Sequence, residues 1–333
     1  MPPSNLLGLG IESTAHTFGA SVVDDSKVLS DVKTVYKPPA GAGIHPREAS
    51  RHHTETAASV IRDALTKAGA KPNELRFVAY SMGPGLGPCL RVGAVVARTL
   101  ASYLRIPLVP VNHAVGHIEL GALLTAASDP VVLLVSGGHT TICAYAAGRW
   151  RIFGETLDLT VGQLLDQFGR EAGYSSPCGA KIEELAEKSV NLLSLPYSVK
   201  GNDVSYSGML TAAKRLLHSG QRLEDICYSL QETGYAMLVE VSERALAFTE
   251  KTELLVVGGV AANRRMSEML REITVRHGAK LHVVPLNYSG DCGAQIAWTG
   301  LLAYRAGVTV PIEKSIVRQS WRLDQVDAPW RSS

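Results

Sequence analysis

The fold is indicated by a stretch near the N-terminus, NLLGLGIESTAHTFGASVVDD (residues 5–25). An apolar run (6–11), a hydroxyl-rich turn and a β-rich segment (17–23) predict a strand, a turn and a second strand. The stretch PVVLLVSGGHTTICAYAAGRWRIFGET (residues 130–156) starts the same pattern again. Two strand–turn–strand units, near residues 7 and 131, indicate a weak internal repeat that is visible in pattern rather than identity.

The length and composition of the chain agree with two such units. Its 333 residues suggest two domains of roughly 150 residues each. Hydrophobic residues make up 46% and charged residues 19%, which favours large cores over disorder. The net charge is only +2, so if the protein binds nucleic acid, part of the affinity would come from other proteins.

Cysteine usage and the apolar runs indicate an intracellular protein. The five cysteines are scattered and form no CxxC pair, which argues against a disulfide framework or a zinc knuckle and fits a reducing cytosol. The start, MPPSNLLGLGIES, lacks the basic and apolar regions of a signal peptide. No apolar stretch reaches the length of about 18 residues that spans a bilayer. We expect a soluble, cytoplasmic protein without membrane contact.

The remaining pattern alternates short strands with helices. We expect a helix at 46–65, opened by Pro46, and a strand at 77–80, followed by the loop GPGLGP and a helix at 91–104. A strand at 106–111 follows. After the second unit we expect helices at 161–171, 180–188, 208–218 and 223–250. The strand–turn–helix ELLVVGGVAANRRMSEML, the strand KLHVVP and a helix after SGDCGAQ complete the chain.

The segment VNHAVGHIEL (111–120) holds two histidines, His113 and His117. Four residues apart on a helix, they share one face, so they are either a metal clamp or two core histidines bonded to backbone carbonyls. The zinc-protease pattern HExxH is absent. Asp291, in the turn SGDCGAQ, is the best candidate for a third ligand, and its alternative role is a helix N-cap. Two histidines and a carboxylate suit iron(II), with zinc or manganese as alternatives.

Glycine turns follow two buried strands, in LLVSGGHTT and LLVVGGVAANRR. Their backbone N–H groups can bind phosphate or carboxylate oxygens. Neither GxGxxG nor GxxxxGK[ST] occurs, so a dinucleotide fold and a P-loop are not indicated. Asp166 is either part of a solvated helix face or a ligand contact, and Glu183 either favours a helix dipole or binds sugar hydroxyls. GIHPREASRHH is either a solvated basic face or a contact to an RNA backbone.

These segments, taken in order from about residue 7 to 330, resemble one family. The segments are GIESTAHTFG, GIHPREASRHH, MGPGLGPCLRVG, VNHAVGHIE, LLVSGGHTT, GETLDLTVGQLLDQFGRE, VKGNDVSYSGM, LVVGGVAANRR and SGDCGAQIAWTG. They are similar to the TsaD/KEOPS family of tRNA threonylcarbamoyladenosine transferases, formerly described as O-sialoglycoprotein endopeptidase-like. GPGLGPCLRVG, STAH and IVRQSWRLDQV resemble its archaeal and eukaryotic branch, the catalytic subunit of the KEOPS complex.

The resemblance implies an α/β fold of two duplicated actin-like domains, as in sugar kinases, Hsp70 and actin, with the site in an interdomain cleft. We place the N-terminal domain at 1–129 and the C-terminal domain at 130–300. A C-terminal helix and tail, 301–333, is expected to pack back on the N-terminal domain.

The resemblance also implies the site residues. One iron-type divalent metal is held by His113, His117 and Asp291. The nucleotide moiety is contacted by the following residues: Leu134, Val135, Ser136, Gly137, Gly138, Asp166, Gly179, Glu183 and Asn263. Two positions depart from the family: Leu134 replaces a tyrosine proposed as a fourth ligand, and His139 replaces the asparagine of a GGN turn.

The implied reaction moves a threonylcarbamoyl group from threonylcarbamoyl-AMP to the N6 amino group of adenosine 37 in tRNAs reading codons that begin with adenine. Glu12 is our candidate for a catalytic residue on the acceptor side. No organic cofactor is expected. The implied partners are tRNA, a small kinase/ATPase subunit, a small dimerising subunit and an adaptor. Alternatives are an ATPase or sugar kinase of the same fold, a metalloprotease, and a non-enzymatic scaffold.

Overall fold

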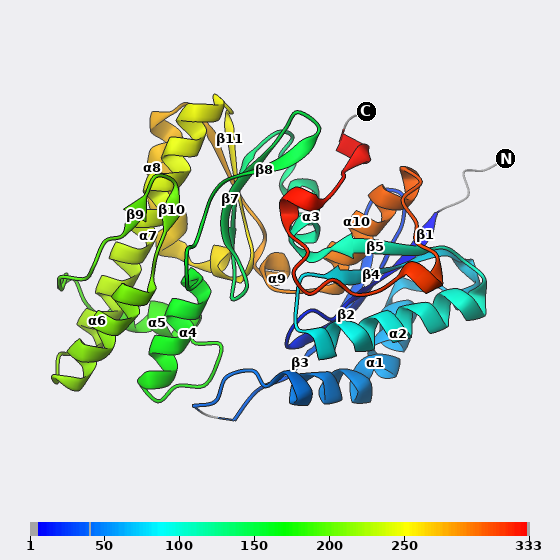
Figure 1. Cartoon of the computed structure of the whole chain (residues 1–333), viewed down its shortest axis with the longest axis horizontal. Coiled ribbons are helices and arrows are strands. Elements are labelled where there is room, and N and C mark those ends of the chain that lie inside the picture. Colours follow the sequence, from blue (N-terminus) through cyan, green and yellow to red (C-terminus); the bar gives the residue numbers. More distant parts are fainter. Residues whose placement is uncertain (1–5, 40, 332–333) are drawn as a thin grey trace.

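Two five-stranded sheets organise the chain, seen in a computed structural model that describes residues 6–39 and 41–331 (Figure 1). The first sheet has the order β3-β2-β1-β4-β5. Its strands are β1 (Leu7–Glu12), β2 (Thr17–Val23), β3 (Val28–Val35), β4 (Leu75–Gly83) and β5 (Leu108–Asn112). The central strand β1 runs antiparallel to β2 and parallel to β4.

The second sheet repeats this arrangement in the order β12-β11-β6-β7-β8. Its strands are β6 (Val131–Val135), β7 (Thr140–Ala146), β8 (Arg149–Glu155), β11 (Glu253–Val257) and β12 (Lys280–Val283). The central strand β6 is antiparallel to β7 and parallel to β11, as β1 is to β2 and β4. The duplicated fold predicted from the sequence is therefore confirmed, with β1 and β6 in equivalent places.

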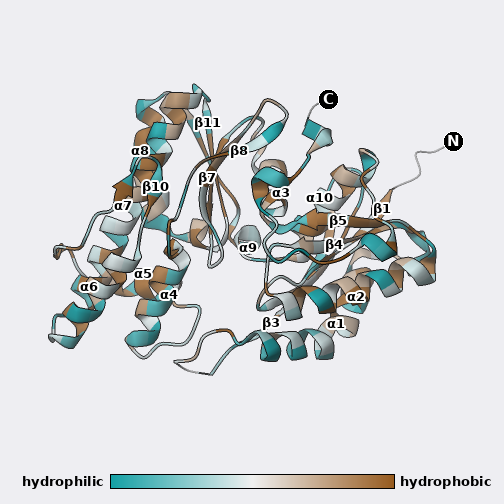
Figure 2. Ribbon diagram, in the orientation of Figure 1, coloured by the Kyte–Doolittle hydropathy of each residue, from teal (hydrophilic) through white to brown (hydrophobic). Residues whose placement is uncertain are grey.

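The apolar runs form the central strands because both faces of each sheet are covered. Every residue of β6 is buried, as are four of the five in β11, and parallel strands covered on both faces read as near-continuous apolar runs. Much of the hydrophobic colouring in Figure 2 accordingly lies on strands. The mixed segment that forms β3, VLSDVKTV, lies at an edge and was not predicted as a strand.

Helices α1 (Pro46–Ala68) and α2 (Gly87–Leu104) pack on one face of the first sheet. Helix α1 begins at Pro46 as predicted, and it ends where Gly69 adopts a left-handed conformation with φ of 65°. Helix α2 begins four residues before its predicted start. Its first turn holds Pro88, whose fixed φ suits that position.

Helices α7 (Leu223–Thr249) and α8 (Arg264–Arg276) pack against the second sheet. Helices α5 (Gly179–Ala186) and α6 (Ser207–His218) pack on α7, and α4 (Val161–Glu171) packs on α5 and α6. Short elements complete this half: the hairpin of β9 (Val199–Lys200) and β10 (Asp203–Val204), and the helix α9 (Leu286–Ser289). The predicted helices at 161–171 and 208–218 agree with α4 and α6 to within one residue.

Helices α3 (His113–Thr125) and α10 (Gly293–Arg305) lie where the two halves meet. Helix α10 packs on β1 and β2, and α3 packs both on α10 and on β11. Glycines permit the close approach of α10: a Cβ on Gly10 would lie 2.1 Å from the Ala297 nitrogen, and one on Gly19 would lie 2.7 Å from the Gly293 nitrogen. The contact between backbones fixes α10 directly against the first sheet.

The C-terminal tail runs from the first half to the second. Arg318 N donates to the Met82 carbonyl at 2.8 Å, and further on Arg331 makes two hydrogen bonds, of 2.6 and 2.8 Å, to the buried Glu119 carboxylate on α3. The domain limits predicted above stay a prediction, and their outermost residues, 1–5 and 332–333, lie outside the described part of the chain. Among the described residues, no helix is both long and apolar enough to cross a membrane.

Candidate metal centre

Helix α3 presents its two histidines on one face. It begins at His113 because Asn112 Oδ1 accepts hydrogen bonds from Ala114 N at 3.0 Å and Val115 N at 3.2 Å, which caps the helix. His113 and His117 lie one turn apart and are 5% and 3% exposed. Their rings meet edge to face with centroids 4.7 Å apart.

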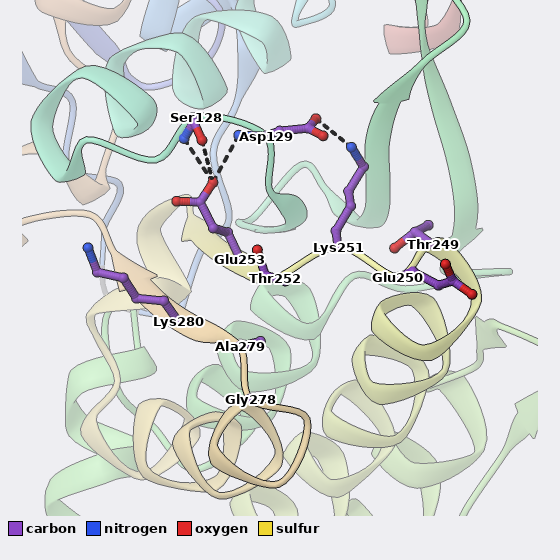
Figure 3. Close-up of a pocket in the computed structure, with 10 residues that line it drawn as sticks. All are labelled: Ser128, Asp129, Thr249, Glu250, Lys251, Thr252, Glu253, Gly278, Ala279 and Lys280. Carbon is purple, nitrogen blue, oxygen red and sulfur yellow. Dashed lines mark hydrogen bonds and ion pairs between the residues drawn. The ribbon is translucent and has the colours of Figure 1, made fainter.

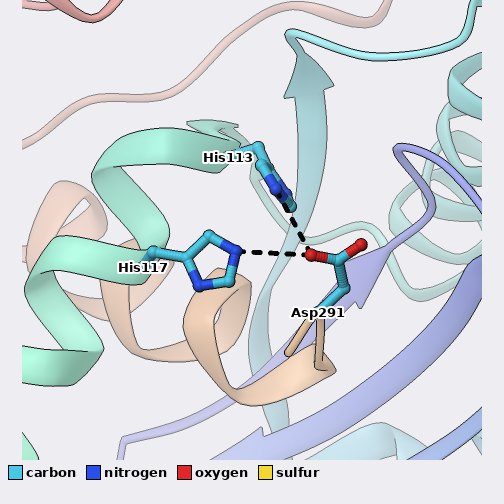
Figure 4. Close-up of side chains that lie close together, drawn as sticks. All are labelled: His113, His117 and Asp291. Carbon is cyan, nitrogen blue, oxygen red and sulfur yellow. Dashed lines mark hydrogen bonds and ion pairs between the residues drawn. The ribbon is translucent and has the colours of Figure 1, made fainter. Parts of the chain in front are cut away.

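Asp291 reaches the same point from a distant part of the sequence. Its Oδ1 lies 3.3 Å from His117 Nε2 and 3.5 Å from His113 Nε2 (Figure 4). The potential ligand atoms of the three side chains all lie within 4.8 Å of one another. The three predicted ligands are therefore brought together, although Asp291 follows His117 by 174 residues in the sequence.

The alternative role considered for Asp291, a helix N-cap, is filled by another residue. Cys292 occupies the N-cap position of α10 without a side-chain cap, and Asp31 Oδ1 accepts a hydrogen bond from Ala294 N at 2.9 Å. Asp31 reaches this helix end from β3. The Asp291 carboxylate is left to face the two imidazoles.

The donor set fits a divalent metal. Two imidazole nitrogens and one carboxylate oxygen leave coordination positions open, and they suit Fe(II), Zn(II) or Mn(II). His113, His117 and Asp291 can thus bind one metal ion.

A second layer of polar groups orients His113. Its Nδ1 lies 3.0 Å from Glu12 Oε2 and 3.0 Å from Gln295 Nε2. The Glu12 carboxylate has no exposed surface, and Thr14 N donates to its Oε1 at 2.6 Å. A carboxylate on one ring nitrogen holds the ring so that the other nitrogen faces the metal position. Sequence reasoning missed this arrangement, because the pairing of Glu12 with His113 depends on the fold.

The charges of the group shift its pKa values strongly. Burial opposes charge on His113, but the Glu12 and Asp291 carboxylates outweigh burial and raise the pKa of His113 to about 9. Burial lowers the pKa of His117, and the positive charge of His113 adds to this. Burial alone would raise the pKa of Asp291, but His113, His117 and His16 together lower it.

Five of the predicted nucleotide contacts lie at the end of β6 and in the turn that follows it (136–139). Leu134 and Val135 are fully buried in the sheet, whereas Gly137 and Gly138 are exposed. Ser136 Oγ accepts hydrogen bonds from Gly138 N at 3.1 Å and His139 N at 3.0 Å, which closes the turn. The His139 ring stacks on that of His113 with centroids 6.1 Å apart, so this turn borders the metal centre.

The other predicted contacts form two pairs in the second half. Asp166 Oδ1, on α4, accepts hydrogen bonds from Ser176 Oγ at 2.7 Å and Cys178 N at 3.1 Å, which fixes the loop directly before Gly179. Asp166 is therefore more than a solvated surface residue.

Glu183 and Asn263 meet at the start of α8. Glu183 Oε1 accepts a hydrogen bond from Arg264 N at 2.9 Å, and Asn263 Oδ1 accepts one from Met266 N at 2.9 Å. Glu183 thus interacts with the N-terminus of α8 rather than that of its own helix. Asn263 follows the carboxyl end of β11, and strand ends of this kind are where α/β folds bind ligands.

A surface hollow of about 920 Å³ lies elsewhere (Figure 3). It is formed around Glu253 and Lys280, the first residues of β11 and β12. The site residues follow the opposite ends of these strands. The hollow is therefore not part of the metal centre.

Comparison with known proteins agrees with this picture. The TsaD family, described as tRNA N6-adenosine threonylcarbamoyltransferase, matches residues 27–298. The protein of that name from Caldivirga maquilingensis is 51% identical over 98% of both chains. A "probable bifunctional tRNA threonylcarbamoyladenosine biosynthesis protein" from Methanothermobacter thermautotrophicus is 50% identical over 98% of this chain and 61% of its own length.

Solved structures with low identity share the fold. HypF of T. kodakarensis superposes with a TM-score of 0.65 at 14% identity, covering 94% of this chain and 49% of that one. The ROK hexokinase of Thermus thermophilus gives a TM-score of 0.51 at 15% identity over 91% and 100%.

The duplicated sheets give the chain the actin-like fold class, which it shares with the HypF and hexokinase structures, and the buried His–His–Asp group is a candidate metal site. Within that class, the chain belongs to the TsaD family and is a tRNA N6-adenosine threonylcarbamoyltransferase, a tRNA-modifying enzyme.

Proposed function

We propose that the acyl donor is threonylcarbamoyl-AMP and that the acceptor is the N6 amino group of adenosine 37 in tRNAs reading codons that begin with adenine. The carbonyl–oxygen bond to AMP breaks, a carbonyl–nitrogen bond forms, and AMP leaves while N6 loses a proton. The observation that carries the proposal is the buried His113–His117–Asp291 group in a chain of this family.

We propose that His113, His117 and Asp291 hold one divalent metal, iron(II) being the ion we expect. When bound, it supplies Lewis acidity toward substrate oxygens rather than redox chemistry. Glu12 is then a positioning residue: its contacts with His113 Nδ1 and Thr14 favour orienting the ligand over touching the acceptor.

The remaining residues hold the donor. Because the mixed anhydride of the donor is already activated, the chain mainly needs to position the reactants and stabilise developing charge. We assign the exposed backbone of Gly137 and Gly138 to the phosphate, and Asp166, Gly179, Glu183 and Asn263 to the nucleoside. The carboxylates of Asp166 and Glu183 can accept further hydrogen bonds from ribose hydroxyls, and their side chains are 26% and 17% exposed. Asp166 Oδ2 also pairs with Arg170 Nε at 3.4 Å.

A transfer assay with threonylcarbamoyl-AMP carrying labelled threonine tests the proposal. We expect metal-loaded protein to place label on tRNA, and a His113→Ala, His117→Ala double variant to place none. ATP turnover without tRNA, with no transfer, would instead indicate an ATPase or sugar kinase. Release of peptide fragments at full metal loading would indicate a protease. Normal tRNA modification by the double variant in the presence of the partner subunits would favour a scaffold role and count against a metal role.

We also propose that the chain works in the cytoplasm as the catalytic subunit of a KEOPS-type complex, with a small kinase/ATPase, a small dimerising subunit and an adaptor. The net charge of +2 supports partners that add affinity for tRNA. The bifunctional relative, of which this chain covers 61%, supports physical association with a further protein of the same pathway. Strong, salt-sensitive tRNA binding by the chain alone would contradict this proposal.

A further inference from the structure

The turns after the two equivalent strands β1 and β6 have the same residues at three of five positions. Residues 13–17 read STAHT and residues 136–140 read SGGHT. Each segment begins directly after its strand and ends on the first residue of the next one. His16 and His139 therefore occupy equivalent places in the two halves of the molecule.

Both histidines border the metal centre. The His139 ring stacks on the His113 ring at an angle of 25° between their planes. The turn that carries His16 also touches His113, because Thr14 Oγ1 lies 3.3 Å from His113 Nδ1. His16 lies two residues after Thr14 in that turn. The two imidazoles thus approach the metal centre from different sheets.

Each of these histidines has an unused polar atom. The Nδ1 atoms of His16 and His139 are both buried, and neither has a hydrogen-bond partner among the described residues. Buried polar side-chain atoms in native proteins nearly always have a partner. A lone unpaired nitrogen would suit a buried water, but two of them in equivalent turns beside one site indicate a shared ligand.

The missing partner is not the metal itself. Among the described residues, the ligand atoms of His113, His117 and Asp291 lie within 4.8 Å of one another. His16 and His139 are not part of this group. Each ring nitrogen of a histidine can donate or accept a hydrogen bond, depending on the tautomer. Two imidazoles beside a metal site are therefore suited to a ligand that is rich in oxygen.

We propose that His16 and His139 bind the acyl group of the donor from the two halves of the molecule, each through Nδ1 to an oxygen of the threonylcarbamoyl moiety. This inference rests on the proposed function and names the residues that recognise its acyl group. The AMP part of the donor lies outside these contacts. The two histidines therefore distinguish the acyl adenylate from free AMP.

Asparagine and leucine substitutions test the proposal as a matched pair. Both side chains resemble the first part of histidine in shape, but only asparagine keeps a polar atom where Nδ1 lies. The measurement is the dissociation constant of threonylcarbamoyl-AMP and of AMP for metal-loaded wild type, His16→Leu, His16→Asn, His139→Leu and His139→Asn. His218→Leu, an exposed histidine 67% accessible in its side chain, is the control.

We expect each leucine variant to bind threonylcarbamoyl-AMP about 10- to 100-fold more weakly, as for loss of a hydrogen bond to a charged or desolvated group. Asparagine should recover most of this loss. Affinity for AMP should stay within about twofold, because AMP lacks the acyl group. Metal content and thermal midpoint should not fall, since leucine removes a polar atom that is unpaired within the chain.

Unchanged affinity in the leucine variants would overturn the proposal, as would an equal loss of AMP affinity or a loss of metal. Should a leucine variant fail to fold, alanine at the same position carries the test, because it also removes Nδ1 and should weaken binding of threonylcarbamoyl-AMP but not of AMP. A wild-type protein that binds threonylcarbamoyl-AMP but transfers nothing to tRNA would contradict the proposed function instead, and the two failures are thus distinguishable.

Discussion

The turns after β1 and β6 occupy equivalent places, yet they are built differently. In the first turn Ser13 is fully buried and Thr14 is 3% exposed, and Thr14 bonds to the carboxylate behind His113. In the second turn the corresponding positions after Ser136 are glycines that remain exposed. One copy of a duplicated unit thus supports the metal ligands, while the other leaves its backbone open to a substrate.

The side chains explain the difference. In the first turn Thr14 Oγ1 donates to Glu12 Oε1 at 2.5 Å, and the Ala15 carbonyl lies 3.1 Å from Nε2 of the buried His53. The second turn is held from one side by Thr160, whose Oγ1 donates to the Gly137 carbonyl at 3.1 Å and also caps α4. We call the three metal ligands with the turn after β1 the metal side, and the turn after β6 the nucleotide side. Four substitutions, in order of decreasing effect, test whether the two sides are separate.

The largest effect is expected from Asp291→Asn. An amide is a far weaker metal ligand than a carboxylate, and Asp291 Oδ1 is the oxygen that faces both histidines. We expect metal content to fall to near zero and transfer to fall by about 1,000-fold or more, as for loss of a principal electrostatic group. The measurements are metal analysis of anaerobically purified protein and the transfer rate. AMP affinity serves as the control and should persist, and its loss would contradict a separate nucleotide side.

Glu12→Gln should weaken metal binding and transfer less than Asp291→Asn does. Removing a carboxylate that orients a ligating histidine typically costs about 10- to 100-fold in metal affinity or activity. Glutamine keeps the shape, so the protein should still fold. Metal titration followed by transfer assays checks the result. Wild-type metal affinity combined with a large loss of transfer would instead support the catalytic acceptor-side role predicted for Glu12 from the sequence.

These residues show how far the sequence alone leads. The HxxxH spacing made His113 and His117 candidate ligands, the glycine-flanked turn made Asp291 a third candidate, and the family resemblance joined the three. The structure brings these side chains together. The second layer was not predictable, since Glu12 and Gln295 meet His113 only through sheet pairing and the packing of α10. The edge strand β3 escaped prediction because its apolar and polar residues do not alternate regularly.

The repeat illustrates the same limit. The sequence showed two strand–turn–strand units, but only the equivalent topology of β1 and β6 aligns STAHT with SGGHT residue by residue. Likewise, Asp166 could be a surface acid or a site residue, and its hydrogen bond to Cys178 N decides for an ordered position. Long-range contacts supply this information, and a single sequence carries it only weakly.

Gly162→Ala should disturb the nucleotide side alone. A Cβ at Gly162, on α4, would lie 2.5 Å from the Ser136 carbonyl oxygen and 2.8 Å from the Gly137 nitrogen, so α4 must move away from the turn. We expect a loss of about 1–3 kcal/mol in unfolding free energy, as for overpacking, and weaker AMP binding. Gly208→Ala, on α6, is the matched control, because a Cβ there meets nothing within 4 Å. Equal effects of the two substitutions would contradict the role of α4 in shaping the turn.

The smallest effect at neutral pH concerns His53, which lies beneath the first turn. Burial, together with the charge of His52, lowers the pKa of His53 to about 4 from its ordinary value of 6.5. The folded state therefore holds the neutral ring, and the unfolded state binds the proton first as the pH falls. Its contribution to stability is complete above pH 6.5 and is lost between about pH 6.5 and 4. At pH 5 the loss amounts to about 2 kcal/mol by linkage.

Denaturant unfolding of wild type and His53→Gln at pH 7.5 and 5 checks this. Glutamine should flatten the slope of stability against pH, because it cannot take up the proton. If the slope persists in the variant, another buried group beneath the metal side is responsible for the acid sensitivity.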